Sequence, residues 1–144
     1  MSGTEAFVLH EKLAEDTVSL AKSELSELRL MNDRNYPWLL LVPERVGARE
    51  IYELAPADQQ RLLRESSAIG EAMMNAFEGH KLNVAALGNM VPQLHLHHVV
   101  RYEGDAAWPG PVWGVVSPAA YTEAELREVK KKLVPVVSAF RSVS

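Results

Sequence analysis

The chain has 144 residues, of which 47 % are hydrophobic and 24 % charged, and its formal net charge is −4. This length fits one ordinary domain, residues 1–144, and the composition favours a packed core over disorder. The chain contains no cysteine, which excludes disulfides, thiolate zinc sites and a thiol nucleophile. The negative net charge disfavours general nucleic-acid binding, although backbone N–H groups can still hold a small anion.

The N-terminal stretch "MSGTEAFVLHEKLAED" is acidic and interrupted by charge, so it does not have the pattern of a signal peptide. No apolar run approaches the roughly 20 residues needed to span a bilayer. These features and the absence of cysteine predict a cytoplasmic protein without a membrane segment.

The first half of the chain predicts a short helix, two strands, a third strand and a long helix. Residues 5–15 can form the first helix, and residues 17–33 contain two β-like runs with a polar break at 22–24. The apolar run "PWLLLVPE" (37–44) indicates a buried strand that Pro43 closes, because proline cannot donate to a ladder. Helical spacing of apolar residues predicts the longest helix over 55–79, with Gly79 as its stop.

The second half predicts two strands, a loop and a further helix. Residues 81–88 and 93–102 have strand patterns, and residues 104–114 are rich in Gly and Pro, as is typical of a loop. Residues 121–140 favour a helix that starts at a capping box of Thr122 and Glu125 and that Pro135 kinks or ends.

The order of these elements predicts an α+β domain. The link between 81–88 and 93–102 is short, and a short link favours antiparallel pairing because a parallel pair needs a long crossover. We therefore expect helices packed on one face of a mostly antiparallel sheet.

The stretch "PQLHLHHVVRY" (92–102) holds three of the five histidines. Side chains alternate along a strand, so Gln93, His95 and His97 should share a polar face, while Leu94 and Leu96 point to the core. Neutral imidazole is both a nucleophile and a proton carrier near pH 7. The polar face is therefore the candidate site of chemistry.

This stretch resembles the signature of the histidine-triad (HIT) superfamily, His-φ-His-φ-His-φ-φ with φ hydrophobic, and Gln93 stands where the first His is expected. "MNDRNYPWLLLVPE" is similar to the family's earlier strand pair, and "KLNVAALGNMVPQLHLHHVV" to its approach to the triad. A further family histidine, in a Gly-His pair, is here replaced by Pro37-Trp38. The likeness covers roughly residues 17–102 and is nearest to the bacterial hydrolases of dinucleoside polyphosphates.

The resemblance implies a HIT-like fold, with a five-stranded sheet, a long helix and a C-terminal helix, in a homodimer. It implies nucleotidyl transfer: His95 attacks the α-phosphorus of a nucleoside phosphate ester, anhydride or amidate, and water cleaves the nucleotidyl-histidine. His97 would contact the phosphate or the leaving group and supply a proton, and Gln93 would donate a neutral hydrogen bond. No metal or other cofactor is required. The residues implied to bind substrate are Asn32 or Asp33 at the ribose and Asn83, Gly88, Asn89 and Met90 at the phosphates.

Other interpretations remain open for these residues. Two histidines at i and i+2 can bind a metal, but a third ligand is not evident beside them. The alternative function is a HIT-fold nucleotide-binding or scaffolding module with little turnover, because two family histidines are replaced. We expect His98 to be packed on the core face, and Trp108 and Trp113 to anchor their loop by packing, with base stacking as the alternative.

Overall fold

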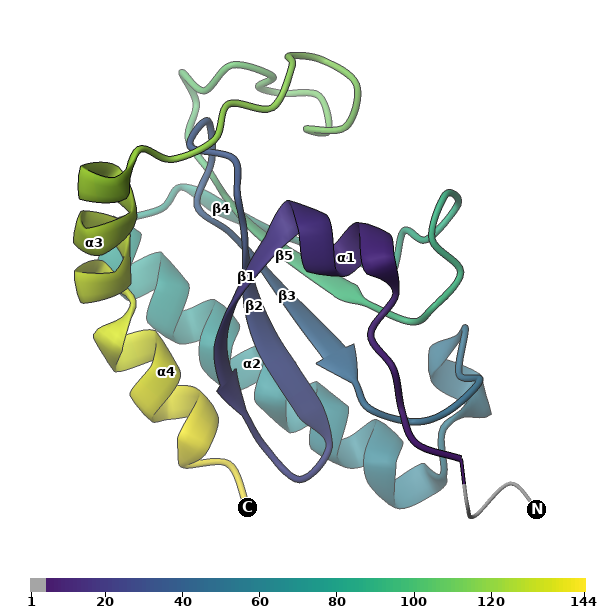
Figure 1. Ribbon diagram of the computed structural model, residues 1–144. Coiled ribbons are helices and arrows are strands. Elements are labelled where there is room, and N and C mark those ends of the chain that lie inside the picture. Colours follow the sequence, from purple (N-terminus) through teal and green to yellow (C-terminus); the bar gives the residue numbers. More distant parts are fainter. Residues whose placement is uncertain (1–4) are drawn as a thin grey trace.

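The computed structural model describes residues 5–144 and contains a five-stranded sheet with helices on both faces (Figure 1). The strands are β1 (Thr17–Lys22), β2 (Ser26–Met31), β3 (Trp38–Pro43), β4 (Lys81–Ala85) and β5 (Leu96–Arg101). The helices are α1 (Glu11–Asp16), the 3-10 turn η2 (Ile51–Glu53), α2 (Pro56–Phe77), α3 (Glu123–Lys132) and α4 (Val134–Arg141). The spatial order of the strands is β1-β2-β3-β5-β4, and every neighbouring pair is antiparallel. The predicted α+β class and the pairing of the last two strands are confirmed.

Strand β3 is apolar at every position and is buried on both of its faces. Leu39 and Leu41 pack in the core on the α2 side, whereas Leu40 and Val42 pack in a second cluster on the opposite side. A strand that is covered on both faces needs apolar residues throughout rather than in alternation.

The two faces of the sheet are covered by different segments. Figure 1 shows α2 behind the sheet and α1 in front of it, with α3 and α4 along one side. Leu13 of α1 packs with Trp38 and Val112 on the front face. The expectation that helices cover only one face is therefore wrong, because the short first helix, whose packing surface is essentially one leucine, covers the other.

Several boundaries differ from the sequence prediction. Strand β5 begins at Leu96 rather than 93, since Leu94 N–H bonds the carbonyl of Ala48 instead of a strand neighbour. Helix α2 ends at Phe77, two residues before Gly79, and the next residue, Glu78, adopts the left-handed conformation at φ 49°. The predicted C-terminal helix is divided at Leu133, and Pro135 lies in the first turn of α4, as expected for a residue without an N–H.

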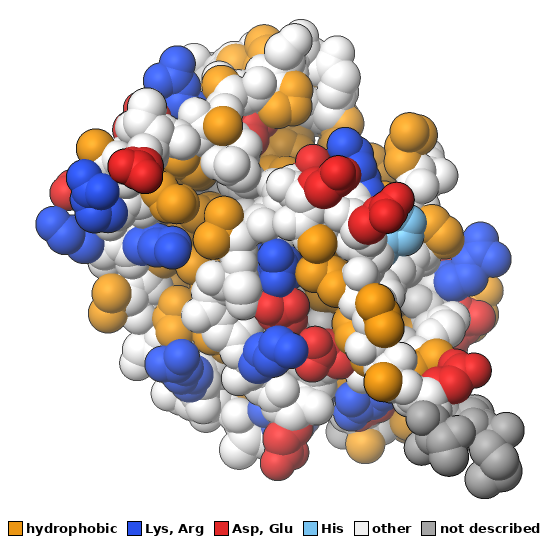
Figure 2. All heavy atoms as spheres, in the orientation of Figure 1, with side chains coloured by type: hydrophobic (Ala, Val, Ile, Leu, Met, Phe, Trp, Pro, Cys, Tyr) orange, Lys and Arg blue, Asp and Glu red, His pale blue; other side chains and the backbone are white. Residues whose placement is uncertain are grey.

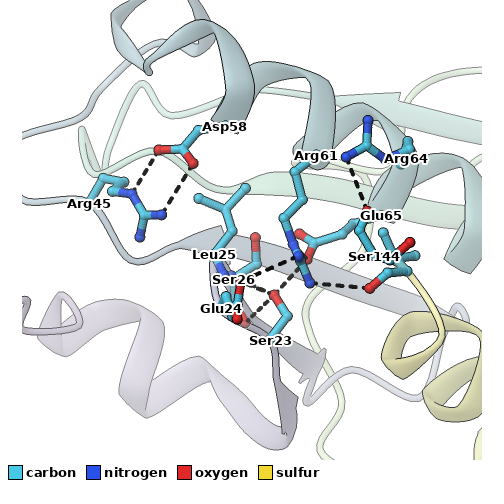
Figure 3. A network of polar contacts seen from close by, with 11 residues as sticks. Ser23, Glu24, Leu25, Ser26, Arg45, Asp58, Arg61, Arg64, Glu65 and Ser144 are labelled. Carbon is cyan, nitrogen blue, oxygen red and sulfur yellow. Dashed lines mark hydrogen bonds and ion pairs between the residues drawn. The ribbon is translucent and has the colours of Figure 1, made fainter.

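A polar network joins α2 to the β1–β2 turn and to the C-terminus (Figure 3). Glu65 is fully buried and accepts hydrogen bonds from Ser23 Oγ at 2.5 Å and from Arg61 Nε at 3.1 Å. Arg61 and Arg64 also donate to the carbonyl oxygens of Val143 and Ser144. These contacts fix one end of the sheet against the long helix, on the face opposite to His95 and His97.

Candidate active site

His95 and His97 line a cavity of about 260 Å³ on the front face of the sheet. Their ring centroids lie 4.8 Å apart, and Leu94 and Leu96 point into the core on the other side, as predicted. The cavity is bounded by α1, by the loop between β4 and β5, and by Trp113 of the long loop after β5. Both histidines are therefore about 95 % buried, yet they face a hollow rather than the main core.

The ring of His95 is held in one tautomer by the backbone. Its Nδ1 lies 2.7 Å from the carbonyl oxygen of Gln93, and a carbonyl only accepts, so Nδ1 carries the proton. The lone pair of His95 Nε2 then remains available, and no hydrogen bond from residues 5–144 engages it. Burial lowers the pKa of His95, with a smaller lowering from His10 and an opposing effect of the Gln93 carbonyl. His95 is thus a neutral imidazole with an available lone pair near pH 7.

His97 is engaged at both ring nitrogens. The indole Nε1–H of Trp38 donates to Nδ1 at 3.0 Å, and Nε2 lies 3.2 Å from the carbonyl oxygen of Leu87. Burial lowers the pKa of His97 to about 4, with a further lowering from the repulsion that a protonated His95 would exert. Protonated His97 is therefore disfavoured at neutral pH.

The side chain of Gln93 is turned toward the N-terminal segment. Its Oε1 accepts from the backbone N–H of His10 at 2.8 Å, and its Nε2 donates to the carbonyl oxygen of Val8 at 2.9 Å. Gln93 therefore contacts His95 through its backbone carbonyl, while its side-chain amide binds the segment before α1.

The loop between β4 and β5 brings Asn89 and Met90 to the cavity wall, together with Leu87 and Val91. A Cβ atom at Gly88 would lie 2.7 Å from the carbonyl oxygen of Val91 and 3.5 Å from Cε1 of His95. Such a contact is too close for any other residue without movement of the loop. Gly88 therefore allows this loop to fold directly against His95.

Asn32 and Asp33 line an adjoining hollow of about 320 Å³. Their side chains also position the segment after the long loop, because Asn32 Oδ1 accepts from Tyr121 N–H and Asp33 Oδ1 from Ala119 N–H. The two hollows share Lys12, Asp16, Met31 and Trp38 as lining residues, so they lie side by side.

Asn83 is not among the described residues that line either hollow. Its Oδ1 instead accepts from Arg101 at 2.8 Å, and Arg101 is also paired with Asp105. Trp108 packs against His80 and Arg101 in the same region, whereas Trp113 packs on Trp38 and His97 at the cavity.

Sequence reasoning did not include α1 in the site. Lys12 and Asp16 form an ion pair of 3.4 Å at the cavity edge, and their i, i+4 spacing indicates a helix but not its position. Nothing in the sequence indicated that this short helix lies over the histidines.

On the face that Figure 2 shows, acidic and basic side chains are interspersed, with a basic group over α3.

Two further properties concern residues 5–144 as a whole. Within them, no three His, Cys, Asp or Glu side chains gather closely enough to hold a metal ion. In the same residues, every helix is too short or too polar to cross a membrane.

Comparison with known proteins identifies the family. The model of the HIT domain matches residues 12–104. A histidine triad protein from Marinobacter aquaeolei is 59 % identical, with a TM-score of 0.92 over 94 % of this chain and 99 % of that one. Histidine triad proteins from Bradyrhizobium japonicum (46 % identity; 90 % and 96 % covered) and Sinorhizobium meliloti (39 % identity; 96 % and 99 % covered) both have TM-scores of 0.87. No curated protein sequence matches the chain. The chain belongs to the HIT domain family.

Proposed function

We propose that this protein cleaves nucleoside phosphates at the α-phosphorus through a covalent nucleotidyl-histidine on His95. The observation that carries the proposal is the hydrogen bond of 2.7 Å between His95 Nδ1 and the Gln93 carbonyl. This contact leaves the Nε2 lone pair of a neutral ring at the cavity, which is the state that a histidine nucleophile requires.

The reaction has two displacements at phosphorus. The His95 Nε2 lone pair forms a bond to the α-phosphorus, and the bond from phosphorus to the leaving group breaks, with its electron pair remaining on the leaving oxygen. The Gln93 carbonyl stabilises the positive ring through Nδ1–H. Water then attacks the same phosphorus, the P–N bond breaks toward Nε2, and the proton of the water passes to solvent.

The other residues bind and orient the substrate in this proposal. His97 donates from Nε2–H to a phosphoryl oxygen in place of the Leu87 carbonyl, and N–H groups of Gly88, Asn89 and Met90 bind the phosphates. Asn32 or Asp33, in the adjoining hollow, is proposed for the ribose. Gln93 contributes its backbone carbonyl and holds the N-terminal segment, whereas Asn83, which bonds Arg101 outside both hollows, has no role in this proposal.

We propose dinucleoside polyphosphates, such as diadenosine tetraphosphate, as the first substrate class, and nucleoside phosphoramidates as the second. The resemblance to the bacterial hydrolases of such compounds, with Gln93 at the position of the first triad His, supports this order. Residues 1–144 would act as one cytoplasmic domain without a cofactor, paired in a homodimer. Light scattering that shows a monomer at micromolar and higher concentrations would contradict the dimer.

A nucleotide-binding or scaffolding module with little turnover is the second candidate. The observation in its favour is that Gln93 and Trp38, at two positions where the family has histidine, are both hydrogen-bonded within the protein. Binding without chemistry would need the cavity but not the available Nε2 of His95.

A panel of nucleotides followed by HPLC tests the proposal. Labelled diadenosine tetraphosphate mixed with the protein and quenched rapidly should give a nucleotidyl adduct that intact-mass and peptide analysis map to His95. His95→Ala should abolish turnover and adduct, while His80→Ala, at a histidine half exposed and beside Trp108, should retain both. Full activity in His95→Ala would exclude the mechanism, and tight binding without adduct or turnover would favour the second candidate.

A further inference from the structure

In the hydrogen bond between Trp38 and His97, only Trp38 can be the donor. The indole nitrogen of tryptophan is a donor and never an acceptor, so His97 Nδ1 must accept at 3.0 Å. The Leu87 carbonyl, 3.2 Å from Nε2, is only an acceptor. Together the two contacts specify a neutral ring with its proton on Nε2.

We propose that Trp38 is a positioning residue that locks His97 as the neutral Nε2–H tautomer and thereby restricts the enzyme to leaving groups that depart without a proton. The second half of this inference rests on the proposed function. The first half concerns the free protein and stands independently of any turnover.

The indole is held firmly in place. Trp38 is 7 % exposed, and its ring makes edge contacts with Tyr36 at 6.2 Å and with Trp113 at 5.9 Å between centroids. Trp38 also lies directly opposite Val99 in the β3–β5 ladder, which fixes its backbone beside the strand that carries His97. Rotation of the indole away from Nδ1 would require these neighbours to move.

The charges around His97 do not favour a second proton. The ring of His95 lies 4.8 Å from that of His97, and its positive form would repel a charged His97. Lys12 and Asp16 of α1 line the same cavity but pair with one another at 3.4 Å. Burial is the largest cause of the lowered pKa of His97, at about 4, and a proton on Nδ1 would in addition break the bond from Trp38.

A His97 ring in this state can donate a hydrogen bond but cannot deliver a net proton without becoming an anion. A phosphate or polyphosphate leaving group takes the electron pair of the broken P–O bond and departs as a stable anion. An amine leaving group must gain a proton as the P–N bond breaks, because an amide anion does not form in water near pH 7. Trp38 should therefore favour anhydrides over phosphoramidates.

The tautomer can be measured without substrate. Nitrogen-15 NMR of the imidazoles, in the full-length protein, should show His97 protonated at Nε2 alone, unchanged between pH 8 and 5.5. In Trp38→Phe, which keeps an aromatic ring but lacks the N–H, only the 3.2 Å contact of Nε2 with the Leu87 carbonyl would remain to hold the proton, so a fraction of the Nδ1–H tautomer should appear beside the Nε2–H form. Trp113→Phe is the matched control, because Trp113 packs on His97 at 5.2 Å without a hydrogen bond to it among the described residues, and it should leave the His97 tautomer unchanged.

The leaving-group preference is measured as a ratio of kcat/KM for diadenosine tetraphosphate over an adenosine phosphoramidate with an alkylamine leaving group. General acid help is worth roughly 100- to 10,000-fold, so Trp38→His, which can exchange protons with His97, should lower this ratio at least tenfold. Trp113→Phe should change both rates together. An Nδ1–H tautomer of His97 in the unmodified protein, or an unchanged ratio in Trp38→His, would overturn the inference. Absence of turnover with any nucleotide would refute the proposed function, while the NMR result would still decide the tautomer.

Discussion

Ser66 Oγ of α2 lies 2.7 Å from Nε2 of His98 on β5, and both side chains are buried in the core between helix and sheet. The carbonyl of Leu96 is 3.1 Å from the other ring nitrogen, Nδ1, so Nδ1 donates and Nε2 accepts the Ser66 hydroxyl proton. His98 is thus the packed core histidine that the sequence predicts, and every one of its polar atoms has a partner.

This arrangement predicts that the protein loses stability in mild acid. Burial lowers the pKa of His98 to about 4, and that of His97 also to about 4, whereas an unfolded histidine titrates near 6.5. Between pH 6.5 and 4 the unfolded chain therefore binds protons that the folded protein excludes. The contribution of each of these two histidines to the free energy of unfolding should be at its maximum above pH 6.5. It should fall by about 1.4 kcal/mol per pH unit between pH 6.5 and 4.

Urea unfolding at a series of pH values measures this loss. His98→Gln should reduce the change of the unfolding free energy with pH, between pH 6.5 and 4, by up to the contribution of one histidine. The variant should also be less stable at pH 8. His80→Gln, at an exposed histidine outside the core, provides the comparison because it leaves both buried imidazoles in place. A slope that does not respond to His98→Gln would contradict a neutral buried ring.

The sequence predicted the parts of the fold that depend on local pattern. The strands around the break at 22–24, the capping box of Thr122 and Glu125 and an interruption of the last helix just before Pro135 are all present, because each depends on neighbouring residues. The loop over 86–95 was predicted as strand at both ends. Its course depends on the distant Ala48 carbonyl and on the close approach of Gly88 to His95, which no local pattern encodes.

The candidate site could be predicted only in part, because a local pattern shows which face a side chain occupies but not which distant groups it contacts. Alternation along the chain indicated that His95 and His97 face away from Leu94 and Leu96. The partners of their ring nitrogens come from Gln93, Trp38 and Leu87, and the last two lie 59 and 10 residues from His97 in the sequence. Which nitrogen is available and which is engaged therefore follows only from the three-dimensional structure.

Substitution of Gln93 should separate its backbone role from its side-chain role. Gln93→Ala removes both amide contacts, to Val8 and His10, but retains the carbonyl that holds His95. We expect faster proteolysis and faster hydrogen exchange in residues 5–10, with a change in kcat smaller than tenfold. Gln93→His, which restores the residue that the family signature has there, should support turnover. A loss of turnover in Gln93→Ala as complete as in His95→Ala would show that the amide itself acts in the chemistry.

His97→Ala should reduce turnover without abolishing it. The change removes a hydrogen-bond donor to the phosphoryl group but not the nucleophile, and loss of one such donor costs roughly 100- to 1,000-fold in kcat. Rapid quenching should still trap the adduct on His95, formed more slowly. His97→Gln, which retains an N–H donor, should recover part of the rate, and the same adduct assay will decide whether it does.

The polar network behind the sheet supports a last prediction, on stability alone (Figure 3). Glu65 is fully buried, its Oε2 accepts from Ser23 and Arg61, and no partner for its Oε1 is present among the described residues. Glu65→Ala would leave the Ser23 hydroxyl without its acceptor and the Arg61 guanidinium, which is about 80 % buried, without its nearest carboxylate. We expect a loss of roughly 3 kcal/mol in the free energy of unfolding, since breaking a buried pair costs about 3–5 kcal/mol.

Asp58 offers a matched comparison on the same helix. It pairs with Arg45 at 2.8 Å, but the Arg45 side chain is 41 % exposed, so water can replace the lost contact. Asp58→Ala should therefore cost about 1 kcal/mol or less. Urea unfolding of both variants at pH 7.5, where the buried histidines are neutral in folded and unfolded chains alike, gives the comparison. Equal losses in the two variants would mean that burial of Glu65 does not strengthen the contacts that join α2 to the β1–β2 turn.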